Sequence, residues 1–257
     1  MTGSAETIPP VAPSIDDEAL RCVQLRGFSV CYPDFDLRPL SFSVTDGERV
    51  ALLGPNGSGK TTLMRAIAGR DLQYSGEILL NGRELRALVP EVRQKVGFLA
   101  EKLVAYGWMS VAEHLRFLSA FYPGWDDEYA TTLLARLGIS PKARMGTLSK
   151  GTAVKLSFVA AQAHRPPLLL LDEPTSGLDP VVRRELLDVV REAVAERPNT
   201  IVVFSTHILE DVEFLADRVI ALHSGGVTID SPIAALRSYE TSPIAPSLYA
   251  LIEGRGR

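Results

Sequence analysis

Residues 54–62 read GPNGSGKTT and match the pattern G-x-x-x-x-G-K-S/T at Gly54, Gly59, Lys60 and Thr61. In a loop of this kind, backbone N–H groups converge on phosphate, the lysine reaches the β- and γ-phosphates, and the hydroxyl holds Mg²⁺. The glycines let the backbone turn tightly and come close to the ligand, because they have no Cβ atom. The nine residues therefore predict a nucleotide-binding site.

The segments on either side of the loop favour the same interpretation. Residues 50–53 are an apolar run typical of a buried strand, and residues 63–68 have the character of a helix that Gly69 ends. Strand, loop and helix are the context that the pattern requires. The helix N-terminus would add a partial positive charge beneath the phosphates.

Composition sets limits on the class of protein. The chain has 257 residues, 46% of them hydrophobic, which is enough for one large domain or for one domain with a subdomain. The net charge of −4 gives no basic signal, so we expect no nucleic-acid partner. The two cysteines, Cys22 and Cys31, form no metal-ligand cluster or disulfide framework and suggest a reducing compartment.

The two ends of the chain differ from its middle. Residues 1–18 are rich in Pro, Ala, Ser and acidic residues and lack the basic and apolar regions of a signal peptide. We expect them to be a disordered N-terminal tail, and we expect residues 241–257 to be a C-terminal tail. No apolar run approaches the ~18 residues that a membrane-spanning helix needs.

Between the tails, the pattern predicts a mixed fold. Residues 20–50 alternate and contain turn residues, which indicates a small antiparallel section. Residues of about 101–165 have helical spacing and read as an inserted helical subdomain. Leu168–Leu171 and residues 200–205 are apolar runs typical of buried parallel strands. The fold class is therefore α/β, with a mainly parallel sheet around a phosphate-binding loop.

A second group of chemically useful residues follows the apolar strand 168–171. The sequence LLLLDE delivers Asp172 and Glu173 to the carboxyl end of that strand, where open α/β sheets hold their ligands. Asp172 is placed to hold Mg²⁺, and Glu173 to orient or deprotonate a water aimed at the γ-phosphate. The alternative is a strand that simply ends in two solvated acids.

Three further segments complete a pattern: LSKGT at residues 148–152, SGLD at residues 176–179, and His207 within STH. A lone histidine after a strand is often structural, but His207 follows the buried strand that comes after the acid pair. In this order the five motifs resemble the ATP-binding subunits of ABC transporters. The resemblance covers about residues 20–236 and makes residues 19–240 one ATPase domain with a P-loop NTPase core.

The resemblance implies ATP and Mg²⁺ as cofactors and a role for each motif. Glu173 would be the catalytic glutamate, and His207 would contact the γ-phosphate and the attacking water. Thr61, Asp172 and Glu101 would contact the metal. Tyr32 stands where an aromatic ring usually stacks on adenine, with a plain edge-strand tyrosine as the alternative. The remaining nucleotide contacts would be Gly54, Pro55, Asn56, Gly57, Ser58, Gly59, Lys60, Thr61 and Thr62.

The resemblance also implies a second subunit. The signature loop, with Ser149, Lys150 and Gly151, would bind the γ-phosphate held by the opposite subunit, and Ser176 and Asp179 would lie at the dimer contact. The family signature is LSGGQ, so LSKGT departs from it, although Ser149 and Gly151 are kept. Glu101 is the other departure, because many relatives have glutamine there. With glutamate at this position, the details of the coupling between ATP hydrolysis and the permease stay open.

The implied partners are a separate integral-membrane permease and a second ATPase subunit, identical or related. The chain would then lie on the cytoplasmic face of the cell membrane, and its branch of the family favours export. Residues 106–109 are a candidate for a groove that holds a permease helix, whereas Trp108 and Trp125 could also be core residues. A soluble ABC ATPase in an assembly or scaffold complex is the main alternative. A simple P-loop kinase would not explain LSKGT, SGLD and His207 together.

Overall fold

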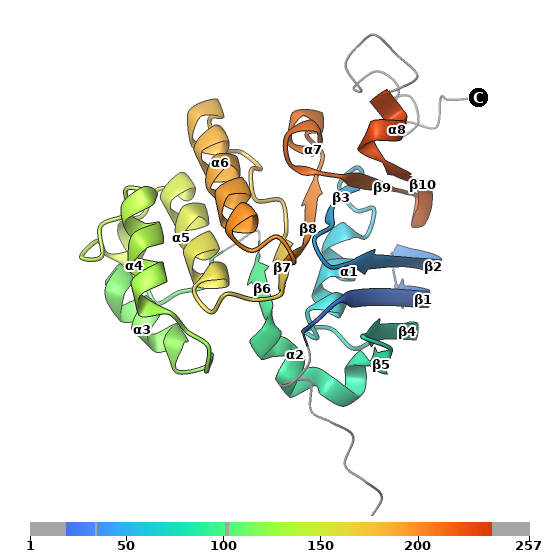
Figure 1. The fold of residues 1–257 in the computed structure, drawn as a ribbon, viewed down its shortest axis with the longest axis horizontal. Coiled ribbons are helices and arrows are strands. Elements are labelled where there is room, and N and C mark those ends of the chain that lie inside the picture. The colour runs from blue at the N-terminus through green and yellow to red at the C-terminus, as the bar shows by residue number, and fades with distance from the viewer. Residues whose placement is uncertain (1–18, 34, 101–102, 238–257) are drawn as a thin grey trace, which may run out of the picture.

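The computed structural model describes residues 19–33, 35–100 and 103–237. The two expected tails, at residues 1–18 and 241–257, lie outside these residues, as does Glu101. The described residues form two β-sheets and a group of helices (Figure 1). Figure 1 shows α3, α4 and α5 at one end of the molecule and the strands β1, β2, β4 and β5 at the other.

The larger sheet has six strands in the order β10-β9-β3-β8-β7-β6. Five strands of this sheet, β9, β3, β8, β7 and β6, are parallel to one another, and β10 pairs with β9 antiparallel. This confirms the mainly parallel α/β prediction. The strands are β3 (Arg49–Leu53), β6 (Val96–Leu99), β7 (Leu168–Leu171), β8 (Ile201–Thr206), β9 (Arg218–His223) and β10 (Gly226–Pro232).

The smaller sheet has four antiparallel strands in the order β2-β1-β4-β5. Its buried residues alternate with exposed ones along β1, as expected for a sheet with one solvated face. The predicted antiparallel section is therefore confirmed, and it extends to β4, which pairs with β1. The strands are β1 (Cys22–Tyr32), β2 (Phe35–Thr45), β4 (Ser75–Leu80) and β5 (Arg83–Glu84).

Helices connect the strands and cover the larger sheet. Between β6 and β7 the chain forms α3, α4 and α5, with a 3-10 turn at Met145–Thr147, and another 3-10 turn at Leu85–Leu88 lies between β5 and α2. Among the described residues, no helix is long and apolar enough to cross a bilayer. The helices are α1 (Lys60–Ile67), α2 (Val89–Lys95), α3 (Val111–Ser119), α4 (Asp127–Arg136), α5 (Lys150–Gln162), α6 (Pro180–Glu196), α7 (Leu209–Leu215) and α8 (Ile233–Arg237).

Polar caps fix where the helices begin. Ser110 and Glu113 form a reciprocal capping box at α3, and the Asp126 side chain caps α4. Asp179 accepts hydrogen bonds from the first N–H groups of α6, as its position before Pro180 predicts. The helix α5 begins at Lys150, and the side chain of Ser149 is its N-cap.

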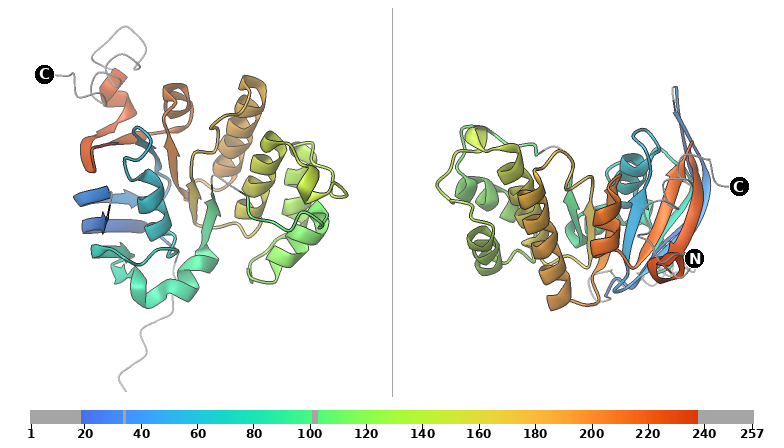
Figure 2. Two further views of the ribbon diagram at one scale, coloured as in Figure 1. Left: turned by 180° about the vertical axis from the view of Figure 1, so that it is seen from behind. Right: turned by 90° about the horizontal axis from the view of Figure 1, so that it is seen from above.

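Two hydrophobic cores meet at the larger sheet. One lies between the two sheets, beside α1 (Figure 2). Leu63, Met64 and Ile67 of α1 belong to this core. The other lies between the larger sheet and the helices α3 to α7. Because α1 starts directly after the glycine-rich loop, its burial between the sheets holds the loop rigidly at the carboxyl end of β3.

His164 gives the fold a predicted dependence on pH. It is buried after α5, its ring stacks on Tyr122 with centroids 4.2 Å apart, and burial lowers its pKa to about 4. The unfolded value is ~6.5, so between these two values only the unfolded chain takes up the proton. The free energy of unfolding should therefore decrease as the pH falls from ~6.5 to ~4, by at most about 1.4 kcal/mol per unit, and level off below.

The variant His164→Phe keeps a ring against Tyr122 and removes this titration. Urea unfolding of both proteins between pH 4 and pH 7 should give a flatter curve for the variant, while the contribution of the carboxylates cancels in the comparison. Parallel curves would show that His164 does not carry the effect.

Candidate nucleotide-binding site

The loop between β3 and α1 requires glycine at fixed points. Gly57 and Gly59 have φ values of 80° and 100°, in the left-handed region that side chains rarely adopt. At Gly54, a Cβ atom would lie 2.3 Å from the carbonyl oxygen of Leu222, and at Gly59 it would lie within 3 Å of Leu37 and Phe35. The loop can therefore keep this shape only with glycine at these positions.

Lys60 points back along the loop. Its ammonium donates hydrogen bonds to the carbonyl oxygens of Gly54 (2.8 Å) and Pro55 (3.1 Å), and it lies 3.4 Å from Oε1 of Glu173. The side chain is only 5% exposed. A buried ammonium is a compact positive charge that can donate charge-assisted hydrogen bonds, so Lys60 is suited to bind a phosphate.

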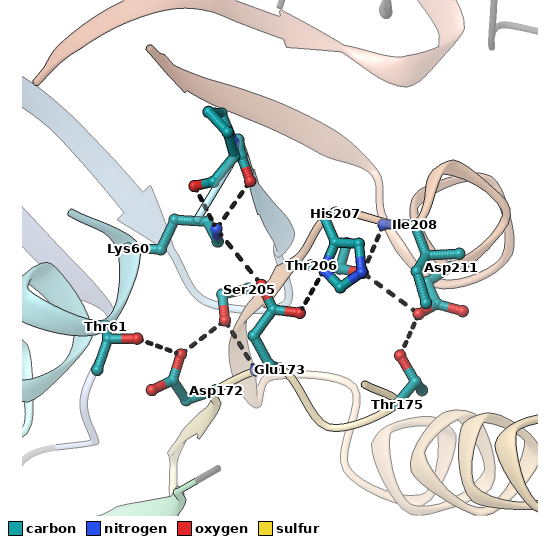
Figure 3. Close-up of polar contacts among 12 residues, drawn as sticks. Lys60, Thr61, Asp172, Glu173, Thr175, Ser205, Thr206, His207, Ile208 and Asp211 are labelled. Atoms are coloured by element: carbon teal, nitrogen blue, oxygen red, sulfur yellow. Dashed lines mark hydrogen bonds and ion pairs between the residues drawn. The ribbon is translucent and has the colours of Figure 1, made fainter. Parts of the chain in front are cut away.

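Thr61, Asp172 and Ser205 form one hydrogen-bonded group (Figure 3). The hydroxyl groups of Thr61 and Ser205 donate to Oδ1 of Asp172 at 3.0 Å and 2.8 Å. The three residues come from α1, from the end of β7 and from β8, which pairs with β7. The parallel strands thus bring hydroxyl and carboxylate oxygens to one edge of the sheet.

Glu173 lies between Lys60 and His207 (Figure 3). Its Oε2 is 2.9 Å from Nδ1 of His207, and its backbone N–H donates to Ser205 Oγ at 2.8 Å. Its φ of 47° is unusual for a residue with a side chain and is the kind of local strain found at functional sites. Among the described residues, Oε1 of Glu173 has no hydrogen-bond partner although it is buried.

Lys60, Thr61 and Glu173 line a cavity of about 600 Å³, which is in the size range of small-molecule sites. Four of its lining residues come from outside the loop: Tyr32, Phe35, Glu173 and Ser176. The loop and the start of α1 supply the rest: Asn56, Gly57, Gly59, Lys60, Thr61 and Thr62.

The donor set fits a magnesium nucleotide. Hydroxyl and carboxylate oxygens, such as those of Thr61 and Asp172, are the ligands that Mg²⁺ prefers. The loop backbone itself lines the cavity at Asn56, Gly57 and Gly59, where its N–H groups can approach a phosphate. Oε1 of Glu173 makes no hydrogen bond among the described residues beyond its ion pair with Lys60, and Glu173 lines the same cavity. The residues at this cavity therefore fit both Mg²⁺ and a nucleotide.

Tyr32 lies at the mouth of the cavity together with Phe35. Its hydroxyl donates to Oδ2 of Asp71 at 2.7 Å, and this hydrogen bond raises the pKa of Tyr32 above its usual value. Oδ1 of Asp71 accepts from the N–H of Gln73, so the carboxylate that holds the ring is itself fixed. The ring is available for stacking, and Phe35 is a second aromatic residue that the sequence interpretation did not single out.

The predicted signature loop lies elsewhere. Ser149, Lys150 and Gly151 are absent from the lining of this cavity in the described part of the chain. Ser149 Oγ accepts the N–H of Thr152 at 3.2 Å, and a Cβ atom at Gly151 would lie 3.1 Å from Val182 of α6. The start of α5 thus packs beside the start of α6, where Asp179 is the N-cap. The chain does not bring this pair of helix starts to its own cavity.

Ser205 was also missed by the sequence interpretation. It is fully buried, it donates to Asp172, and it accepts from the N–H of Glu173. A hydroxyl residue at the carboxyl end of a buried strand, two positions before His207, was the available signal. Serine in such a place is common, so the contact became clear only when β7 and β8 were paired.

The chain is similar in sequence to known ATP-binding proteins. A family profile described as "ABC transporter" matches residues 37–176. The chain is 37% identical to YdbJ, an ABC transporter ATP-binding protein of Bacillus subtilis, over 74% of this chain and 62% of YdbJ, so the match spans less than two thirds of that relative. It is 33% identical to a fluoroquinolones export ATP-binding protein of Mycobacterium tuberculosis, over 82% of this chain and 71% of the relative.

A solved structure agrees with the match. The structure described as an ATP-binding subunit of an ABC transporter aligns with a TM-score of 0.79 and 28% identity. The alignment covers 89% of this chain and 98% of the other.

Proposed function

Because the chain belongs to the family of ATP-binding subunits of ABC transporters, we propose that it binds and hydrolyses ATP to drive transport through a separate permease. The observation that carries the proposal is the alignment of Lys60, Glu173 and His207 beside the cavity. These are a cation for the phosphates, a carboxylate that can act as a base, and an imidazole that contacts that base.

Each side chain has a defined task in this proposal. Lys60 binds the β- and γ-phosphates and gives up its hydrogen bonds to the loop carbonyls when they arrive. Glu173 accepts a proton from the water whose oxygen bonds to the γ-phosphorus, while the bond to the leaving ADP oxygen breaks. His207 holds the Glu173 carboxylate at 2.9 Å and faces the same water. Tyr32 and Phe35 provide an aromatic surface for adenine.

Thr61 and Asp172 would hold Mg²⁺, and Ser205 orients Asp172 for this task. The metal would neutralise negative charge that develops on the phosphate oxygens. Glu101, a third metal contact in the sequence prediction, lies outside the described residues.

The site of this proposal is completed by a second subunit. The signature segment with Ser149, Lys150 and Gly151 lies away from the chain's own cavity, so it is free to meet the phosphates of another subunit. Ser176 lines the cavity and Asp179 caps α6, which places both on the segment between the cavity and that signature segment. The partner is a second copy or a related ATPase.

A surface for the permease is proposed at the exposed aromatic residues Tyr106, Trp108, Phe117 and Phe121. Each is between 44% and 66% exposed. Tyr106 contacts both Trp108 and Phe117, and Phe117 contacts Phe121, with ring centroids 5.3–6.4 Å apart. Exposed apolar patches mark interaction sites. Trp108 is therefore not a core residue, whereas Trp125 packs partly buried against the core. The chain would thus be held at the cytoplasmic face of the membrane.

The test is purification of the full chain from the membranes of the cells that express it. We expect an integral membrane protein with several ~20-residue apolar segments to be purified with it. The variant Trp108→Ser should lose most of that protein, because removal of an aromatic anchor costs about 2 kcal/mol of binding, while its ATP binding should be unchanged.

Leu72→Ser, a change at another half-exposed apolar residue, is the control and should retain the membrane protein. If the wild-type chain brings no membrane protein with it but a stable soluble complex, the scaffold alternative is favoured over transport. Export in place of import, which the name of the Mycobacterium tuberculosis relative suggests, is tested by the direction of cargo movement in vesicles that contain the complex.

A further inference from the structure

Asp211, on α7, is a buried carboxylate to which the proposed reaction gives no task. It is 1% exposed. Its Oδ2 accepts hydrogen bonds from the hydroxyl groups of Thr175 and Thr206, and its Oδ1 accepts from Nε of Arg183 at 2.7 Å. Figure 3 shows Thr175, Thr206 and Asp211 beside the Glu173–His207 pair. The three partners come from three separate segments. Thr206 precedes His207, Thr175 is two residues after Glu173, and Arg183 is four residues after Asp179.

Thr206 connects Asp211 to His207. Its hydroxyl donates to Asp211 at 3.3 Å and accepts the N–H of Ile208 at 3.0 Å. Thr206 and Ile208 are the two neighbours of His207, so these bonds fix the backbone turn that presents the imidazole. A shift of this turn would move the imidazole away from Glu173.

Thr175 connects the same carboxylate to the segment that follows Glu173. Glu173 has a positive φ, and a residue in that region keeps its conformation only where its surroundings hold it. The N–H of Glu173 is held by Ser205, and two residues later the hydroxyl of Thr175 is held by Asp211. Asp211 therefore contacts the supports of both members of the Glu173–His207 pair.

Arg183 connects Asp211 to the proposed dimer contact. It lies in the first turn of α6, four residues after the N-cap Asp179, and it is the cation that compensates the buried carboxylate. Removal of one member of such a buried pair leaves the other charge uncompensated, so the pair itself stabilises the contact between α6 and α7. One oxygen of Asp211 accepts from Arg183, next to the proposed dimer contact. The other accepts from the hydroxyl groups of Thr175 and Thr206, which lie in the segments of Glu173 and His207.

We propose that Asp211 is a positioning residue that holds the side chains of His207 and Glu173 in contact with each other. It also links the position of this pair to the start of α6, where the second subunit would dock. The inference rests on the proposed function, since it assigns regulation to the same site. Docking of the partner at α6 would then change the position of His207 through Arg183 and Asp211. Small misplacements at a catalytic pair cost up to about 10²-fold in rate.

The test is Asp211→Asn in the full chain, which keeps the shape and removes the charge. We expect kcat for ATP hydrolysis to fall about 10- to 100-fold, while KM for ATP stays within about 3-fold, because the phosphate loop is untouched. The matched control is Glu210→Gln. Glu210 precedes Asp211 on the same helix and also approaches Arg183, at 3.5 Å, but it is exposed and contacts neither threonine in the described structure.

A double-mutant cycle separates positioning from stability. If Asp211 acts through His207, Asp211→Asn should cost little in a His207→Ala background, because the effects of coupled residues are not additive. Full additivity, or a wild-type kcat in Asp211→Asn, would overturn the inference. A wild-type chain that does not hydrolyse ATP would instead overturn the proposed function itself.

If Asp211→Asn does not fold, Thr206→Val replaces it. This variant leaves the pair of Asp211 and Arg183 intact and removes only the hydroxyl that holds Ile208. A lowered kcat with KM retained supports the inference, and an unchanged kcat overturns it.

Discussion

Replacement of Glu173 by glutamine is expected to abolish steady-state ATP hydrolysis while ATP binding persists. Glutamine keeps the size of the side chain and one acceptor oxygen, but it cannot take a proton from water. The contact with His207 at 2.9 Å can be retained, so the change removes basicity with little loss of structure. Loss of a general base lowers turnover by about 10²- to 10⁴-fold.

Binding should become no weaker in this variant, and it could be measured directly. The carboxylate lies 3.4 Å from Lys60, so the neutral amide frees the ammonium and removes a negative charge next to the γ-phosphate. ATP should then accumulate in an unreacted state, and the ATP-bound dimer should be trapped. Phosphate release, ATP affinity by titration, and mass by light scattering on one preparation report turnover, binding and dimerisation.

The matched control is Glu192→Gln on α6, which makes the same chemical change in an exposed ion pair with Arg136. It should hydrolyse ATP at the wild-type rate, since surface pairs contribute little. Normal hydrolysis by Glu173→Gln would show that another group is the base. A loss of ATP binding would show that the residue acts on the fold or the loop and not on the reaction.

The features that the sequence predicted are those set by neighbouring residues. The loop at residues 54–62 specifies its own conformation through glycine, and Asp179 with Pro180 specifies the start of α6. The apolar run 168–171 was predicted as a buried strand and is β7, parallel to β6 and β8. Such local signals are sufficient for the fold class. The roles of the site residues stay predictions.

The features that the sequence did not predict depend on distant pairs. Ser205 meets Asp172 only because β8 lies beside β7, and Asp211 meets Thr175 and Arg183 from 36 and 28 residues away. The helix α2 was not among the elements that the sequence indicated, and Pro90 lies in its first turn, where proline is compatible with a helix. The contact of Tyr32 with Asp71 spans 39 residues and has no local signal.

Replacement of Lys60 by alanine is expected to eliminate measurable nucleotide binding. Its ammonium is the buried cation that faces Glu173 at the cavity, and it is the group that would meet the β- and γ-phosphates. Truncation of one partner of a buried charge pair costs about 2–5 kcal/mol, which is roughly 30- to 10³-fold or more in Kd. Titration of ATP with the full chain in the presence of Mg²⁺ measures the change.

Alanine also removes the two hydrogen bonds from Lys60 to Gly54 and Pro55, so a changed loop could lose the nucleotide for a second reason. Lys60→Met separates the two causes, because methionine keeps most of the length and apolar contact without the charge. If charge is decisive, the methionine variant should bind as poorly as alanine, and Lys142→Met on an exposed loop should bind normally. If Lys60→Met retains wild-type affinity, the charge assigned to Lys60 does not contribute to nucleotide binding, because no other lysine lines this cavity among the described residues.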